Sequence, residues 1–213
     1  MREKQTETAK PTLKELLLSD SDRFDLEIPA RGNLIHREVE EAILFSELST
    51  GSTMHRLAIQ SDLERVFSIY MAPNVVRYLG YEPMPLDSFR SIYQELTASK
   101  SFYVYQIDEV IAGFYKASQH PGRASHVGYL GSLAVAPEFQ GHGVAERMVR
   151  GAMEVLCQTG AKRIELIVES DNPRAITFYE RLGFQKEGTL RKFYKRADEA
   201  NFVDDYIMSV IYD

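Results

Sequence analysis

The chain has 213 residues, 44% hydrophobic and 26% charged, a composition that suits one globular core with an appendage and excludes a chain dominated by disorder. Its formal net charge of −6 gives no electrostatic reason to bind nucleic acid and would favour a cationic substrate. The first ten residues are polar, and no apolar run approaches the ~20 residues of a membrane span. We therefore predict a cytoplasmic protein without a nucleic-acid or membrane partner.

Residues 1–50 differ in composition from the rest of the chain. They hold eleven acidic and seven basic residues, and so carry −4 of the net charge. Two stretches, 12–18 and 37–48, have the apolar spacing of short helices, and a polar linker follows at 49–52. We interpret this N-terminal extension as a partly helical arm that docks on the main domain or on the second subunit of a homodimer. The alternative is a segment that binds another protein.

From Met54 onward the predicted elements follow a regular order, which defines a second domain at 54–213. That order is a strand at 55–59, helices at 63–71 and 87–98, strands at 102–107, 110–118 and 125–135, a helix from 144, a strand at 164–168, a helix at 173–182, and strands near 184–194 and 202–211. The crossover through the helix from 144 implies one parallel pair of strands. We therefore predict an α/β (α+β) fold with a mixed, mostly antiparallel central sheet and helices on both faces.

The stretch 132–145 changes from a strand to a helix across a turn with two glycines. Pro137 ends the strand, and the apolar spacing that follows has the period of a helix. The free N–H groups at the start of that helix suit an anion, and Gly141 and Gly143 leave room for a ligand near the backbone. The turn lacks the third glycine of a dinucleotide fingerprint and the Lys-Ser/Thr pair of an NTPase phosphate loop. The sequence therefore predicts a phosphate site of another class.

The pattern Gln140-x-x-Gly143-x-Ala145 resembles the pyrophosphate-binding motif of the general N-acetyltransferase (GNAT) superfamily. A second pattern, similar to the family's next signature, follows at the expected distance: Asn172-x-x-Ala175-x-x-x-Tyr179-x-x-x-Gly183-Phe184. The tail from 187 to 208 is similar to the closing strands of bacterial amino-acid, ribosomal-protein and antibiotic acetyltransferases. The resemblance covers roughly 54–213 and implies an acyl-CoA N-acyltransferase-like fold.

This resemblance implies a site for acetyl-coenzyme A (acetyl-CoA) as cosubstrate. The backbone of Leu133, Ala134 and Val135 would pair with the pantetheine arm, and an N–H there would polarise the thioester carbonyl. Asn172 would bond the end of the pantetheine, and Tyr179 would be the catalytic acid that protonates the departing sulfur. The pyrophosphate would be held by the residues of the turn: Gln140, Gly141, His142, Gly143, Val144 and Ala145.

The general base is the part of the site that the pattern does not supply. Some related branches carry a glutamate on the strand before the turn, where this chain has Leu130. Glu165, Glu169 and Asp204 are available, each with the alternative of a solvated or ion-paired carboxylate, and a chain of water molecules could serve instead. The histidines lack metal-ligand spacing, so we assign no metal.

The acceptor side of the site is predicted only in outline. Tyr70, Tyr78 and Tyr81 flank a loop where members of the family build part of the acceptor pocket, and ordinary packing is the alternative for each. The leading hypothesis is direct acetyl transfer, without a covalent intermediate, to a primary amine of an amino acid, polyamine or antibiotic. The alternatives are acetylation of a protein N-terminus or lysine, and a regulatory module that only binds acetyl-CoA. The sequence does not identify the acceptor.

Overall fold

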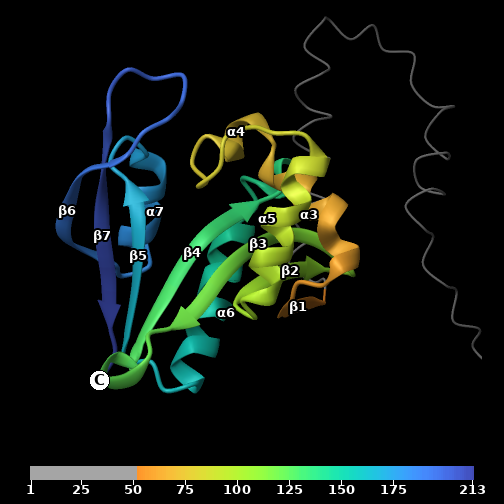
Figure 1. Cartoon of the computed structure of the whole chain (residues 1–213). Coiled ribbons are helices and arrows are strands. Elements are labelled where there is room, and N and C mark those ends of the chain that lie inside the picture. The colour runs from red at the N-terminus through yellow and green to blue at the C-terminus, as the bar shows by residue number, and fades with distance from the viewer. Residues whose placement is uncertain (1–51) are drawn as a thin grey trace, which may run out of the picture. The chain divides into compact units, whose positions relative to one another are not determined.

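The computed structural model describes residues 52–213 (Figure 1). The N-terminal extension predicted at 1–50 lies outside these residues. Between 52 and 213, no helix is long and apolar enough to cross a membrane.

A seven-stranded mixed sheet organises the described part of the chain, with the strand order β1-β2-β3-β4-β5-β7-β6. Only β4 and β5 pair in parallel, because helix α6 carries the chain between them, and every other neighbouring pair is antiparallel. The strands are β1 Thr53–Leu57, β2 Phe102–Ile107, β3 Val110–Gln119, β4 Val127–Val135, β5 Arg163–Glu169, β6 Gln185–Tyr194 and β7 Val203–Ile211. The predicted mixed sheet is confirmed.

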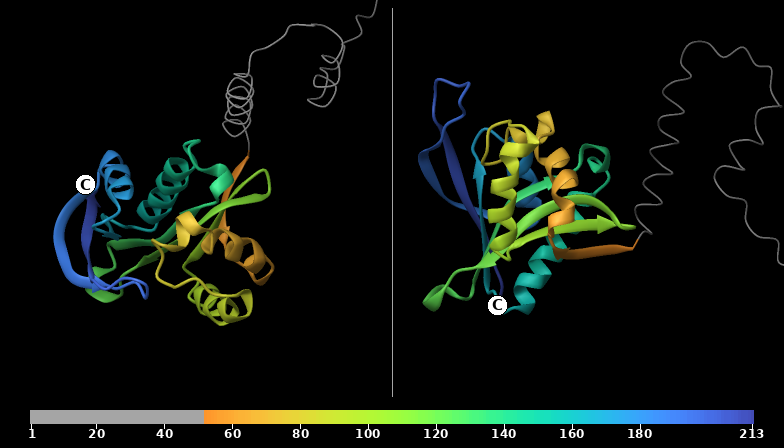
Figure 2. Two further views of the ribbon diagram at one scale, coloured as in Figure 1. Left: turned by 90° about the horizontal axis from the view of Figure 1, so that it is seen from above. Right: turned by 45° about the vertical axis from the view of Figure 1, so that its right-hand side comes forward.

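The helices cover both faces of this sheet, which Figure 2 shows from above. They are α3 Leu63–Tyr70, α4 Pro73–Val76, α5 Leu86–Ala98, α6 Val144–Gln158 and α7 Pro173–Arg181. The core consists of two hydrophobic clusters, one on each face of the sheet, because successive side chains of β3 point to opposite faces. Tyr115 packs in the cluster with α6, and Phe114 packs in the cluster with α3 and α5. Tyr70 belongs to the second cluster, stacked on Phe114 with ring centroids 5.6 Å apart. For Tyr70 the packing alternative therefore holds.

The start of the domain differs from the sequence prediction at the first strand. The first strand ends at Leu57 rather than at residue 59, because the chain turns there into a short 3₁₀ helix, Gln60–Asp62. Asp62 does not cap α3 with its side chain. Its carboxylate instead accepts the N–H of Ile59 at 2.9 Å and pairs with Arg56 at 2.7 Å. Asp62 is buried, and burial alone would raise its pKa. The bonds to Arg56 and Ile59 outweigh this effect and hold the pKa below its usual range.

The middle of the sheet opens because β4 and β5 pair only along part of their length. Their ladder ends at the pair Leu130 and Leu166, although β4 continues to Val135 and β5 to Glu169. A bulge in β4 lies at the same place, where three steps along β4 oppose two along β3. Ser132 within it has a φ of 45°, which is rare for a residue other than glycine. The two strands therefore diverge, as Figure 1 shows, and leave backbone groups unpaired inside the sheet.

Removing residues 1–50 should leave the domain folded and able to bind acetyl-CoA. The reason is that β1 begins at Thr53, and Ser52 already bonds the β2–β3 turn through Asp108 at 2.9 Å. Circular dichroism of the truncated chain should show the helix and strand signal that the elements of residues 52–213 account for, together with a cooperative thermal transition. An unfolded truncated chain would mean that residues 1–50 contribute to the core.

Candidate active site

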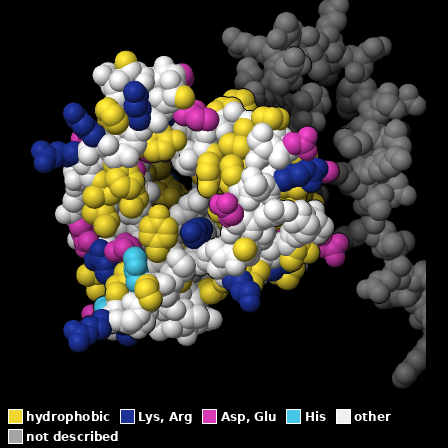
Figure 3. All heavy atoms as spheres, viewed as in Figure 1, with side chains coloured by type: hydrophobic (Ala, Val, Ile, Leu, Met, Phe, Trp, Pro, Cys, Tyr) yellow, Lys and Arg dark blue, Asp and Glu magenta, His cyan; other side chains and the backbone are white. Residues whose placement is uncertain are grey.

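A cavity of about 690 Å³ lies where β4 and β5 diverge. Its walls come from these two strands, the glycine turn before α6, the first turns of α6 and α7, the α4–α5 loop and the end of β6. Figure 3 shows the surface hollowed at this place, between the half with α3 and α5 and the half with β5, β7 and β6, with hydrophobic side chains around the opening. We call this cavity the cleft.

The glycine turn gives one end of the cleft a backbone suited to an anion. Gly141 and Gly143 have φ angles of 86° and 70°, in the left-handed region that glycine adopts without steric cost. Gly143 is the N-cap of the 15-residue α6, and no side chain caps the helix there. The first N–H groups of α6 therefore have no partner from a capping side chain and lie at the positive end of the helix dipole.

Gln140 supports this turn from behind. Its Nε2 donates to the carbonyl of Val135 at 2.8 Å, and its Oε1 accepts from Asn74 at 2.9 Å. The amide thus joins the end of β4 to the turn and to α4. Its side chain therefore holds the turn in position, and the contact of Gln140 with the pyrophosphate stays a prediction.

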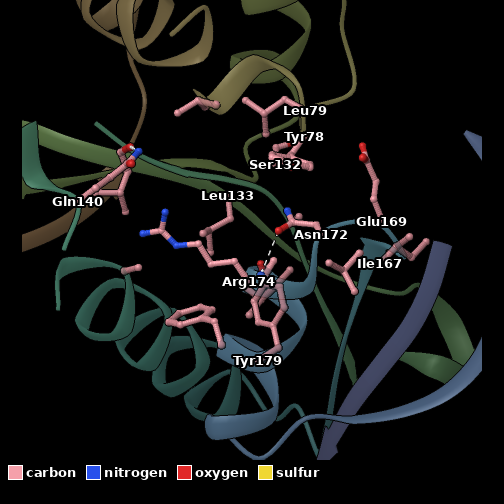
Figure 4. A pocket seen from close by; sticks show the side chains of 18 of the residues that line it. Tyr78, Leu79, Ser132, Leu133, Gln140, Ile167, Glu169, Asn172, Arg174 and Tyr179 are labelled. Atoms are coloured by element: carbon pink, nitrogen blue, oxygen red, sulfur yellow. Dashed lines mark hydrogen bonds between the residues drawn. The ribbon is translucent and has the colours of Figure 1, made fainter. Parts of the chain in front are cut away.

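Asn172 stands at the other wall of the cleft as the N-cap of α7. Its Oδ1 accepts the N–H of Ala175 at 3.1 Å, which satisfies one free donor of the helix and fixes the side chain. Its amide nitrogen makes no hydrogen bond with residues 52–213, which leaves it available to a ligand. Figure 4 shows Asn172 between the ends of β4 and β5, above Tyr179.

Tyr179 extends from α7 into the base of the cleft, as Figure 4 shows. Its ring packs edge-on against Phe178 and Phe184, with centroids 5.2 and 5.7 Å away. Burial raises the pKa of its hydroxyl to about 12, with a smaller contribution from Tyr129. Within residues 52–213 that hydroxyl has no hydrogen-bond partner, so at neutral pH it holds a proton that it can donate into the cleft.

The structure brings together most of the residues that the sequence predicts for the site. Leu133, Val135, Gln140, Gly141, Gly143, Val144, Ala145, Asn172 and Tyr179 all line the cleft. Ala134 instead lies in the core with α3 and α5, since it points to the opposite face of β4 from its neighbours. His142 lies within the turn, between the two glycines, but does not line the cleft. Leu130 is buried in the core and offers no chemistry.

The three carboxylates considered as bases lie in different surroundings. Glu165 pairs with Arg163 at 3.0 Å, away from the cleft, and Asp204 accepts the backbone N–H of Lys192 at 2.7 Å. Only Glu169 lines the cleft, where it is buried and paired with Arg196. Its ion pair with Arg196 already engages the carboxylate of Glu169, so this residue is not a free proton acceptor in the cleft.

The sequence reasoning missed four charged residues of the cleft: Glu146, Arg174, Arg181 and Asp205. Arg174, exposed on α7, extends into the cleft in Figure 4 and makes no hydrogen bond or ion pair with any residue between 52 and 213. Its place directly after Pro173, at the start of a helix facing the glycine turn, is the signal that could have found it. Asp205 also lines the cleft, from β7, and carried no motif.

Hydrogen bonds join two loops over the far end of the cleft. The hydroxyl of Tyr194 at the end of β6 donates to the carbonyl of Leu79 at 3.0 Å. Beyond β6, the N–H of Ala197 donates to Glu82 at 2.8 Å. Arg196 donates to the carbonyl of Arg77 at 3.2 Å. We call these contacts the loop bridge, which ties the α4–α5 loop to the end of β6 and the residues that follow it.

The described residues offer no evident metal centre. Between 52 and 213, no three histidine, cysteine, aspartate or glutamate side chains lie close enough together to hold a metal ion.

The glycine turn, the cap of α7 and the divided sheet correspond to a known family. A model described as the Acetyltransferase (GNAT) family matches residues 63–184, a range that includes both motifs. The chain therefore belongs to this family and is an N-acetyltransferase.

Individual relatives show where this similarity extends. L-amino acid N-acetyltransferase AaaT of Escherichia coli (strain K12) is 32% identical over 160 residues, which cover 72% of this chain and 94% of AaaT. N-alpha-acetyltransferase 30 of Schizosaccharomyces pombe is 37% identical over 73 residues, which cover 34% of this chain and about half, 49%, of that protein. The fold is similar to that of spermidine N-acetyltransferase from Vibrio cholerae in complex with CoA and spermine, with a TM-score of 0.64, 21% identity, and coverage of 75% of this chain and 95% of that chain.

Proposed function

We propose that this protein transfers the acetyl group of acetyl-CoA directly to the primary amine of a small molecule such as an amino acid, a polyamine or an antibiotic. The observation that carries the proposal is the cleft between β4 and β5, with an anion-binding backbone at one end and a bridged, partly acidic pocket at the other. Similarity to AaaT over nearly the whole of that enzyme supports the small-molecule class.

The residues of the cleft fit acetyl-CoA in charge and shape. The N–H groups at the start of α6 face the cleft where a pyrophosphate would be neutralised, and Arg174 adds a cation from the opposite wall. The edge of β4 that faces β5 has no strand partner after Leu130, and it offers backbone donors and acceptors to an extended, amide-bearing arm. Acetyl-CoA, when bound, supplies the acetyl thioester.

The side chains then divide the remaining work of transfer. Asn172 orients the ligand through its free amide nitrogen, while its oxygen stays on the helix cap. Tyr179 holds a proton across the neutral range and donates it to the departing sulfur. The bulge at Ser132 turns the backbone of β4 toward the gap, where an N–H can polarise the carbonyl under attack.

The loop bridge supports an acceptor that enters by one end. A lysine within a polypeptide needs a groove that is open on both sides, and the contacts of Tyr194 and Ala197 close one side. A small amine and a free chain terminus can both enter a site from one end. Acetylation of a protein N-terminus is therefore the second candidate, supported by the similarity to N-alpha-acetyltransferase 30 over 73 residues.

Release of free coenzyme A thiol in the presence of an amine panel tests this proposal. The panel holds the proteinogenic L-amino acids, spermidine, spermine, an aminoglycoside, short peptides with free N-termini, and N-blocked peptides with an internal lysine. We expect turnover with at least one small amine and none with the blocked peptides. Turnover confined to free N-termini would support the second candidate, and binding of acetyl-CoA without turnover of any amine would contradict transfer.

A further inference from the structure

Asp205 is a buried carboxylate without a partner at the acceptor end of the cleft. Its side chain is only 5% exposed, and its Oδ1 atom is buried without a hydrogen bond to any residue between 52 and 213. A buried carboxylate is normally paired or hydrogen-bonded, because removal from water strongly disfavours its charge. Burial accordingly raises the pKa of Asp205, and the charge of Asp171 raises it further. A residue in this state is ready to receive a proton or a cation.

The surroundings of Asp205 carry an excess of negative charge. Arg196 pairs with Glu169, with Asp171 at 2.8 Å and with Glu199 at 3.2 Å, and Arg77 pairs with Glu199 at 2.8 Å. Both guanidinium groups are thus committed to the other three carboxylates, so the ionised cluster with Asp205 has a charge of −2. A bound cation would offset part of this excess.

The position of Asp205 in the sheet directs it toward the reacting end of the cleft. It lies opposite Glu169 across the β5–β7 ladder, and both line the cleft. Tyr129 interacts electrostatically with both Asp205 and Tyr179. Its pKa is raised by burial and then by charges that include Asp205, and Tyr129 in turn contributes to the raised pKa of Tyr179. The Tyr129 ring lies against Gly131, where a Cβ atom would come within 2.7 Å of it.

We propose that Asp205 binds the acceptor amine as a primary ammonium ion and accepts the proton that the amine loses before transfer. This inference rests on the proposed function and adds to it a base and a substrate class, the cationic alkylamines. Between 52 and 213 no residue bonds the Oδ1 atom of Asp205, and the ionised cluster around it carries an excess of negative charge. In this role Asp205 is a catalytic residue, because it touches the nitrogen that attacks.

The protons and electron pairs balance in this scheme. The ammonium ion gives one proton to the Asp205 carboxylate, and the lone pair that this frees forms the new N–C bond. The C–S bond breaks with its electron pair on sulfur, which takes a proton from Tyr179. The nitrogen then loses its second proton, which restores Tyr179, and Asp205 returns its own proton to water.

Asp205→Asn tests the proposal, with Asp204→Asn as the matched control. Both changes remove one negative charge at adjacent positions, and the Asn at 204 can still accept the N–H of Lys192. With the best amine of the panel at pH 7, we expect kcat/KM to fall by about 10² to 10³ for Asp205→Asn and less than threefold for the control. At pH 9.5, where more of the amine is already neutral, the deficit should shrink to less than tenfold.

Other titratable or charged groups that face Asp205 also influence the pH dependence of turnover. These are Tyr129, Glu169, Asp171, Tyr194, Arg196 and Asp204. A merely structural role for Asp205 would lower turnover equally at both pH values. Equal turnover of Asp205→Asn and wild type at pH 7 would overturn the assignment and leave the proposed function intact.

A second measurement needs no acetyl-CoA and no turnover. We expect n-butylammonium chloride to raise the thermal midpoint of wild type and of Asp204→Asn by more than the same concentration of sodium chloride does. For Asp205→Asn, the two salts should have the same effect. The midpoint of Asp205→Asn alone should exceed that of wild type at pH 8, because a group with a raised pKa destabilises the fold once it ionises. Failure of all amines in the panel together with a positive ammonium response would contradict transfer but retain the cation site. The absence of both the ammonium response and the higher midpoint would overturn the site.

Discussion

We expect Gly143→Asp to weaken the binding of acetyl-CoA at least a hundredfold. The φ of 70° at this N-cap places the residue at the mouth of the helix, where the N–H groups face the cleft. A carboxylate there repels the pyrophosphate at a short distance and can also occupy the free donors itself, as a capping aspartate does. Isothermal titration of acetyl-CoA into the folded variant measures the change.

Gly143→Asn provides the matched control for this experiment. Asparagine has nearly the same shape as aspartate and also tolerates the left-handed region. The comparison therefore separates charge from bulk, and we expect Gly143→Asn to weaken binding about tenfold, clearly less than Gly143→Asp. Affinity of Gly143→Asp equal to that of wild type would show that the anion lies elsewhere, and equal losses in both variants would assign the effect to bulk.

Tyr179→Phe should lower turnover by roughly tenfold to a thousandfold while the affinity for acetyl-CoA changes less than threefold. The substitution keeps the ring that packs on Phe178 and Phe184 and removes only the proton donor. A thiol has an ordinary pKa near 8.5, so protonation helps the departing sulfur at neutral pH without being indispensable. Single-turnover measurement with the accepted amine isolates this step from product release.

The control for Tyr179→Phe is Tyr115→Phe, which removes a hydroxyl that bonds His55 at 2.8 Å in the core. It should alter stability but not turnover. Because the pKa of Tyr179 is about 12, its proton is present throughout the neutral range. The ratio of wild-type to variant turnover should therefore stay constant between pH 6 and 9. Unchanged turnover under conditions where chemistry limits the rate would reduce Tyr179 to a packing residue.

The sequence predicted the elements and the turn well, because each depends on local chemistry. Apolar periodicity located α6, and Gly141 and Gly143 located the left-handed turn before it. The bulge was not predictable in the same way. Its left-handed residue is Ser132, which carries no such preference, and its position follows from the register of β3 and β4.

Asp205 shows why the acceptor side could not be read from the sequence. Asp204 and Asp205 are adjacent acids in a strand, and alternation says that they point to opposite faces but not which one faces the cleft. The answer depends on pairing with Glu169, 36 positions earlier in the chain. Gln140 illustrates the same limit, since the motif indicated a residue near the ligand but not that its amide is bonded to Val135 and Asn74.

The early end of the β4–β5 ladder has a consequence for the lifetime of the protein. The part of the sheet formed by β5, β7 and β6 is joined to the rest by four backbone pairs, from Val127 with Arg163 to Leu130 with Leu166, and by packing beneath α6 and α7. A ligand that bonds both strands would act as an additional strand in the opening. By mass action, such a ligand protects the chain from unfolding and proteolysis in proportion to its abundance. The amount of this enzyme that survives would then follow the supply of its own acetyl donor.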